Sequence, residues 1–85
     1  GPPLGESAWL ARATRNTTVV WSDRYRPAAA RRGRADIRIT DVTIPDPPAL
    51  LVPAADADFF LSPTRDVLIF SMSGSGADGI YRLTL

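Results

Sequence analysis

Short apolar segments separated by polar turns run through most of this 85-residue chain, and their lengths indicate strands rather than helices. Residues 18–21 are β-branched and aromatic, which favours a strand. Residues 36–44 alternate between apolar and polar side chains, so Ile37 and Ile39 are expected to point into a core. Residues 67–70 are continuously apolar, which predicts a strand that is covered on both faces.

Proline marks where several of these strands are expected to end. A proline-rich stretch at 45–48 follows the 36–44 strand, and Pro53 is expected to end the next one, because proline has no N–H to donate to a ladder. Ser-Pro-Thr-Arg-Asp at 62–66 predicts a type I turn with Pro63 in its second position. The pattern as a whole predicts an all-β chain of about seven short antiparallel strands without a convincing helix, at residues 7–11, 18–21, 36–44, 50–52, 58–61, 67–70 and 80–85.

Two stretches of the chain follow the same order of elements. In the first, a strand around Trp21 precedes a polar loop and a strand around Ile37. In the second, a strand around Phe70 precedes a Gly-rich loop and a strand around Ile80. Repeats of this kind indicate units that stack to bury faces they cannot bury alone. We therefore divide the chain into a flexible lead or tag remnant at 1–6, a first sheet unit at 7–52 with a long Arg-rich loop at 23–35, and a second unit at 53–85.

The second unit carries a recognisable motif. Asp-Phe-Phe-Leu-Ser-Pro-Thr-Arg-Asp-Val-Leu-Ile-Phe-Ser at 58–71 is followed by Gly-Ala-Asp-Gly-Ile-Tyr-Arg-Leu at 76–83. This order resembles the repeat of TolB-like β-propellers, which has a Ser-Pro-Asp-Gly turn, a buried strand ending near Phe-Ser, a Gly-rich loop and Asp-Ile-Tyr. Thr64-Arg65 stands where the family has Asp-Gly, and residues 14–44 resemble the repeat more faintly. The resemblance implies two propeller-blade-like sheet units; a small immunoglobulin-like β-sandwich is the alternative for seven strands in a chain of this length.

Composition excludes several kinds of chemistry. The sequence contains no Cys, no His and no Lys. Disulfides, a typical zinc site, Ser-His or Cys-His nucleophile pairs and a Schiff-base lysine are therefore excluded. No apolar run approaches the roughly 20 residues of a membrane span. We expect a chain that is not an enzyme and that uses no metal or cofactor.

Positive charge is concentrated in one window. Residues 24–38 hold six arginines and one aspartate, which gives the window a charge of +5 against −4 for the rest of the chain. A basic loop can contact phosphates or another anionic surface. The simpler interpretation is a solvated connection between two strands, and pairing with an acidic surface of the same assembly is a further alternative. The residues that we expect to bind a partner are Arg24, Tyr25, Arg26, Arg31, Arg32 and Arg34.

Three other features have a functional and a structural interpretation. Asp56 and Asp58 could share a hard cation, although a role at a turn or strand start is favoured. The Ser/Gly-rich segment 71–79 lacks the Gly-Lys-Ser/Thr of a phosphate loop, so a hairpin loop is predicted. Six aromatic side chains are expected in the core, namely Trp9, Trp21, Phe59, Phe60, Phe70 and Tyr81; if a few of them were exposed together, they would mark a partner surface.

The resemblance implies a non-catalytic protein-binding or scaffold module, extracytoplasmic in a bacterium, with a protein partner or self-association. A second hypothesis is a propeller piece of a prolyl-oligopeptidase-type serine peptidase, whose catalytic residues lie in a separate hydrolase domain. A third is binding of an anion or of nucleic acid through the Arg-rich loop. No membrane span is expected.

Overall fold

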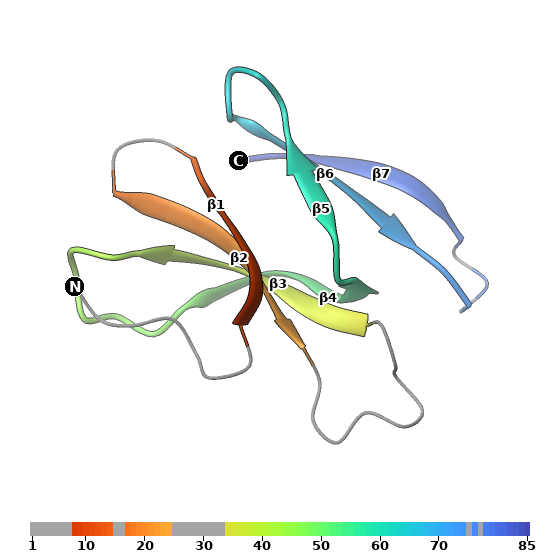
Figure 1. The fold of residues 1–85 in the computed structure, drawn as a ribbon, viewed down its shortest axis with the longest axis horizontal. Coiled ribbons are helices and arrows are strands. Elements are labelled where there is room, and N and C mark those ends of the chain that lie inside the picture. The colour runs from red at the N-terminus through yellow and green to blue at the C-terminus, as the bar shows by residue number, and fades with distance from the viewer. Residues whose placement is uncertain (1–7, 15–16, 25–33, 75, 77) are drawn as a thin grey trace.

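The computed structural model describes residues 8–14, 17–24, 34–74, 76 and 78–85, and these form antiparallel strands in two sheets (Figure 1). The first sheet has the strand order β1-β2-β3-β4 and the second has the order β5-β6-β7. The predicted all-β architecture with seven strands in two sheet units is thus confirmed. The strands are β1 (Ala8–Ala13), β2 (Thr18–Arg24), β3 (Arg34–Asp41), β4 (Ala49–Asp56), β5 (Phe59–Leu61), β6 (Val67–Met72) and β7 (Gly79–Thr84).

The β2–β3 hairpin extends further than the sequence predicted. Asp23 pairs with Asp36, and Arg24 pairs with Ala35, so β2 continues to Arg24 and β3 begins at Arg34. The connection predicted at 23–35 is therefore shorter at both ends. The predicted hairpin loop between β6 and β7 is confirmed, because Met72 pairs with Gly79 across it.

β4 continues through Pro53, where the sequence predicted its end. The register between β3 and β4 shifts on both sides of Ile37, so Pro53 lies in an irregular part of an edge strand, where a missing N–H costs little. Ala54 has a positive φ of 53° and donates its N–H to Asp36 Oδ1 at 3.0 Å. A side chain of β3 thereby satisfies the backbone at this bend.

The core lies between the two sheets. Ile37 and Val52, which are cross-strand partners in the first sheet, belong to the same buried cluster as Phe59 and Leu68 of the second. Ile39 is partly buried against this cluster, so the predicted inward orientation of Ile37 and Ile39 is confirmed. Burial of a large apolar side chain contributes roughly 1.5–3 kcal/mol relative to exposure, which makes this shared cluster the main attraction between the sheets.

Two predictions about burial were wrong. Within residues 67–70 only Leu68 is fully buried, because no described segment covers the outer face of the second sheet. Phe60 lies on that outer face, opposite Ile69, and is 70% exposed. Of the six aromatic residues predicted in the core, Trp21 and Phe59 are fully buried and Phe70 is partly buried, whereas Trp9, Phe60 and Tyr81 are exposed.

Candidate protein-binding surface

The structure describes the backbone of two of the six residues predicted to bind a partner. Arg24 ends β2 and Arg34 begins β3. The side chain of Arg34 is mostly buried, and its Nη1 lies 3.8 Å from Asp56 Oδ1. The charge of Arg34 is therefore compensated within the chain. The other four, Tyr25, Arg26, Arg31 and Arg32, lie outside the described residues.

Asp56 links the two sheets through a polar cluster. Its carboxylate accepts hydrogen bonds from Ser71 Oγ at 2.6 Å and Ser73 Oγ at 2.7 Å, and it faces Arg34 of β3. The two hydroxyl donors, and to a smaller degree the charge of Arg34, lower the pKa of Asp56 against the opposing effect of burial. Asp58 is exposed, and no carboxylate group suited to a metal ion occurs in the described part of the chain. Asp56 ends β4 and connects the two sheets, whereas the sequence favoured a role at a turn or strand start.

A second polar cluster occupies the face of the first sheet that points away from the core. Arg38 donates to Asp23 Oδ2 at 3.1 Å through Nε and to Asp36 Oδ2 at 3.2 Å through Nη2. The indole N–H of Trp21, which is 1% exposed, donates to Thr40 Oγ1 at 2.9 Å. The charge of Arg38, like that of Arg34, is therefore paired with carboxylates of the same chain.

The turn at 62–66 has the geometry predicted from Pro63. The N–H of Arg65 donates to the carbonyl of Ser62 at 2.8 Å, which is the bond that closes a type I turn with proline in second position. Arg65 has a φ of 63°, a left-handed conformation that glycine adopts most easily. The hydroxyls of Ser62 and Thr64 both donate to the Asp66 carboxylate and hold the turn closed.

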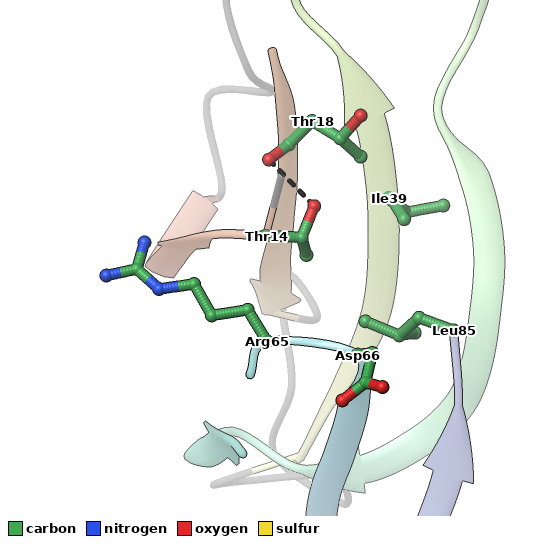
Figure 2. Close-up of a pocket in the computed structure, with 6 residues that line it drawn as sticks. All are labelled: Thr14, Thr18, Ile39, Arg65, Asp66 and Leu85. Carbon is green, nitrogen blue, oxygen red and sulfur yellow. Dashed lines mark hydrogen bonds between the residues drawn. The ribbon is translucent and has the colours of Figure 1, made fainter. Parts of the chain in front are cut away.

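A cleft of about 240 Å³ lies beside this turn, where the two sheets meet (Figure 2). Thr14 Oγ1 donates to the Thr18 carbonyl at 3.1 Å across one end of the cleft. Figure 2 shows the guanidinium of Arg65 pointing away from the Asp66 carboxylate and out of the cleft. Leu85 closes the opposite side. The cleft therefore marks the junction of the β1–β2 turn, the 62–66 turn and the C-terminal end of β7.

The four strands at the sheet borders differ in their protection against pairing with another chain. The pairing of β1 is irregular between Ala8 and Leu10, β4 contains Pro53 and a shifted register, and β5 has three residues. β7 has six residues and an unbroken register with β6 from Gly79 to Thr84. It contains no proline and no bulge, and Arg82 is its one charged residue, so it has few of the usual devices that protect an exposed edge. Among the described strands, β7 alone presents a long regular edge.

The hydrogen-bonding groups on the unpaired side of β7 follow from its register. The N–H of Leu85 donates to the Asp66 carbonyl at 2.8 Å, so Leu85 faces the β6 side. Backbone groups of alternate residues in an antiparallel strand point to the same neighbour. The N–H and carbonyl groups of Ile80, Arg82 and Thr84 therefore point to the open side of β7.

Strand β7 also carries exposed apolar side chains next to its unpaired backbone groups. Ile80 is 81% exposed on the outer face of the second sheet, and Leu83 is 36% exposed on the core-facing side, opposite the buried Leu68. The ring of Tyr81 stacks on Phe70 with a centroid distance of 5.7 Å and remains 41% exposed. Strand β7 with Leu85, which we call the β7 edge, thus combines unpaired backbone groups with exposed apolar surface.

The hairpins of the two sheets have equivalent registers. Ser22 pairs with Ile37 in the β2–β3 hairpin, and Ser71 pairs with Ile80 in the β6–β7 hairpin. Trp21 and Phe70, which correspond in the sequence repeat, each precede the paired serine by one residue. β3 of the first sheet corresponds to β7 of the second, and β3 carries β4 on the side where β7 is open.

Comparison with known proteins gives no relative from which a function could be inferred, so a functional assignment depends on the fold and the surface. No family model, curated protein or solved structure matches this chain. In the described part of the chain, no helix has the length and hydrophobicity needed to cross a bilayer. The structure defines an all-β chain of two packed sheet units, one of which ends in an open strand.

Proposed function

We propose that this chain is a non-catalytic scaffold module that binds protein by strand pairing at the β7 edge, and that the strand it binds is β7 of a second copy. The observation that carries the proposal is the long, regular and unprotected edge of β7, which is exposed along its whole length. An edge of this kind offers main-chain hydrogen bonds for affinity and alternating side chains for selectivity.

The equivalent registers of the two hairpins support this role. A strand added to β7 would give the second unit the same four-stranded order that β4 completes in the first. The same equivalence supports the interpretation of the two sheets as propeller-blade-like units, because blades are four-stranded sheets that pack face to face.

The residues of β7 favour pairing with a second copy of itself. Antiparallel pairing centred on Leu83 places Arg82 opposite Thr84 of the second copy and Tyr81 opposite its Leu85. Arg82 and Thr84 are the residues whose backbone groups point outward, so they would exchange the main-chain hydrogen bonds. Apolar side chains would face one another on the core-facing side, and no two arginines would be directly opposed.

The solution mass of the chain tests this proposal. Multi-angle light scattering over a concentration series should show a species of twice the chain mass. Arg82→Pro removes an outward N–H, leaves the bonds between β6 and β7 in place and should give a monomer. Arg82→Ala is the matched control, because it removes the same charge but keeps the N–H, and it should remain dimeric. Thr84→Pro tests the same edge at a second outward position.

A wild-type chain that remains monomeric throughout the series would refute the proposal. So would a dimer that persists in both proline variants with a native far-ultraviolet circular dichroism spectrum. A dimer lost equally in Arg82→Pro and Arg82→Ala would assign the interaction to the side-chain charge instead of the strand edge.

A further inference from the structure

A second groove lies away from the β7 edge, between the end of β1 and the turn that joins β5 to β6. It has a volume of about 340 Å³, which falls in the range of small-ligand pockets. Arg12 lies opposite Val20 in the β1–β2 ladder, so its side chain is on the core-facing side of the first sheet at the border next to β5. The residues that line the groove are Arg12, Ala13, Phe60, Leu61, Ser62, Pro63 and Arg65.

The two guanidiniums of this groove make contacts of a different kind within the fold from those of Arg34 and Arg38. Arg34 and Arg38 form ion pairs with carboxylates, whereas neither Arg12 nor Arg65 does so with any carboxylate that the structure describes. Arg12 Nη1 donates to the neighbouring Ala11 carbonyl at 3.2 Å. Arg65 Nη1 donates to the Ala13 carbonyl at 3.4 Å. Most of the donors of both groups therefore remain available on the exposed side of the groove.

The backbone at Arg65 provides an independent reason to look for a function. A non-glycine residue in the left-handed conformation costs roughly 1–2 kcal/mol. The backbone bond of Arg65 to Ser62 would also form with glycine, and the Arg65 side chain adds only one long hydrogen bond in return. Strain at a position where glycine would fit better is typical of sites that are kept for a role other than stability.

We propose that this groove binds a carboxylate group of a protein segment. The guanidinium fork matches the planar, two-oxygen geometry of a carboxylate, and two arginines line this one groove. Phe60, which is 70% exposed, and Pro63 give the same groove apolar walls for the carbon chain that carries the carboxylate. The carboxylate belongs either to a Glu or Asp side chain or to a chain terminus, and the chemistry of recognition is the same for both.

The test is a nuclear magnetic resonance titration of the Arg12 and Arg65 Nε–Hε signals with three tripeptides. The first, acetyl-Leu-Glu-Leu-amide, has a side-chain carboxylate. The second, acetyl-Leu-Gln-Leu with a free terminus, has a terminal one. The third, acetyl-Leu-Gln-Leu-amide, has none. Saturable shifts of both signals with the first or the second peptide, and not with the third, are expected, and the responding peptide identifies the source of the carboxylate.

Substitutions assign the binding to the groove. Arg12→Gln and Arg65→Gln should each weaken binding by about tenfold or more, which corresponds to losing a hydrogen bond from a charged donor. Arg82→Gln is the matched control, because Arg82 is also exposed but lies on β7, and it should leave the affinity unchanged. The chemical shift changes on peptide addition should also persist in Arg82→Pro, so the test of the groove is independent of the test of pairing at the β7 edge.

Three results would overturn the assignment. The first is the absence of saturable shifts with either carboxylate peptide in the wild-type chain. The second is saturation by inorganic phosphate alone, which would mark a phosphate site. The third is peptide binding that survives both glutamine substitutions.

Discussion

The strongest single test of how the two sheets are held together is Asp56→Ala. The substitution removes an acceptor of two hydroxyl hydrogen bonds, at 2.6 and 2.7 Å, and one side of the ion pair with Arg34 at 3.8 Å. A hydrogen bond to a charged group contributes about 1.5–3 kcal/mol. Ser73 is exposed, so its bond belongs at the low end, and an ion pair this long near the surface adds at most about 1 kcal/mol. Since each of the two hydrogen bonds contributes at least about 1.5 kcal/mol, we expect a loss of about 3–4 kcal/mol in the free energy of unfolding.

Urea denaturation followed by the fluorescence of the buried Trp21 measures this loss. With a denaturant slope of about 1 kcal/mol per molar, the midpoint should fall by about 3–4 M. Asp58→Ala is the matched control, because Asp58 is exposed and should change stability by less than about 0.5 kcal/mol. A double-mutant cycle with Ser71→Ala should give a coupling energy of about 1–2 kcal/mol.

The pH dependence of the same difference identifies the carboxylate as its source. The pKa of Asp56 in the folded chain is lowered from its ordinary value of 3.8, first by Ser71 and then by Ser73. Its contribution is therefore fully present above pH 3.8 and is lost as the pH falls through the folded pKa. A difference between wild type and Asp56→Ala that is equally large at pH 7 and at pH 2 would contradict this mechanism, as would a zero coupling energy with Ser71.

Two further substitutions test other contacts. Thr40→Val leaves the buried indole N–H of Trp21 without its acceptor and should cost about 1–3 kcal/mol, whereas Thr40→Ser should cost clearly less; equal losses in the same urea assay would contradict a role for the hydrogen bond. Arg65→Gly relieves a left-handed backbone and should raise stability by about 0.5–1 kcal/mol, while Arg65→Ala should not; a higher melting temperature for the alanine variant would argue against strain.

The sequence predicted which segments form strands better than it predicted the residues at which those strands begin and end. Local apolar patterns located all seven strands, because each follows from side chains within a few residues. The end of β2 and the start of β3 were missed because Asp23 and Arg34 were assigned to the loop at 23–35, although cross-strand pairing and ion pairs with Arg38 and Asp56 stabilise them. Pro53 was misjudged because its effect depends on β4 being an irregular edge strand, which is a property of the sheet order.

Burial on the second sheet could not be predicted from local pattern either. Phe60 and Tyr81 are strongly apolar, yet their exposure depends on which face and which border of the sheet they occupy. The alternation around Arg82 indicates a strand but does not show whether that strand has one neighbour or two. The β7 edge was therefore missed, whereas the turn at Pro63 was predicted because its chemistry lies within five residues.

The candidate sites also differ in how visible they are in the sequence. The charge of the arginine window was evident from composition, but the sequence did not show that Arg34 pairs with Asp56 and that Arg38 pairs with Asp23, because both carboxylates are distant in the chain. Arg12 and Arg65 are far apart in the sequence and share a groove only after the sheets pack. The departure from glycine at position 65 was the one local signal of that groove.

The four edge strands of the two sheets differ in how open they are to pairing, and this difference would limit how many copies could add to one another by strand pairing. A chain with two open edge strands can add a neighbour at each and grow into a fibre. In the described part of this chain, only β7 is a long and regular open edge. When two such molecules meet symmetrically, each occupies the other's only vacant position, and the pair has no site left for a third. If the proposed pairing at the β7 edge occurs, the irregular register of β4 at Pro53 and the shortness of β5 favour a closed pair over open-ended polymerisation.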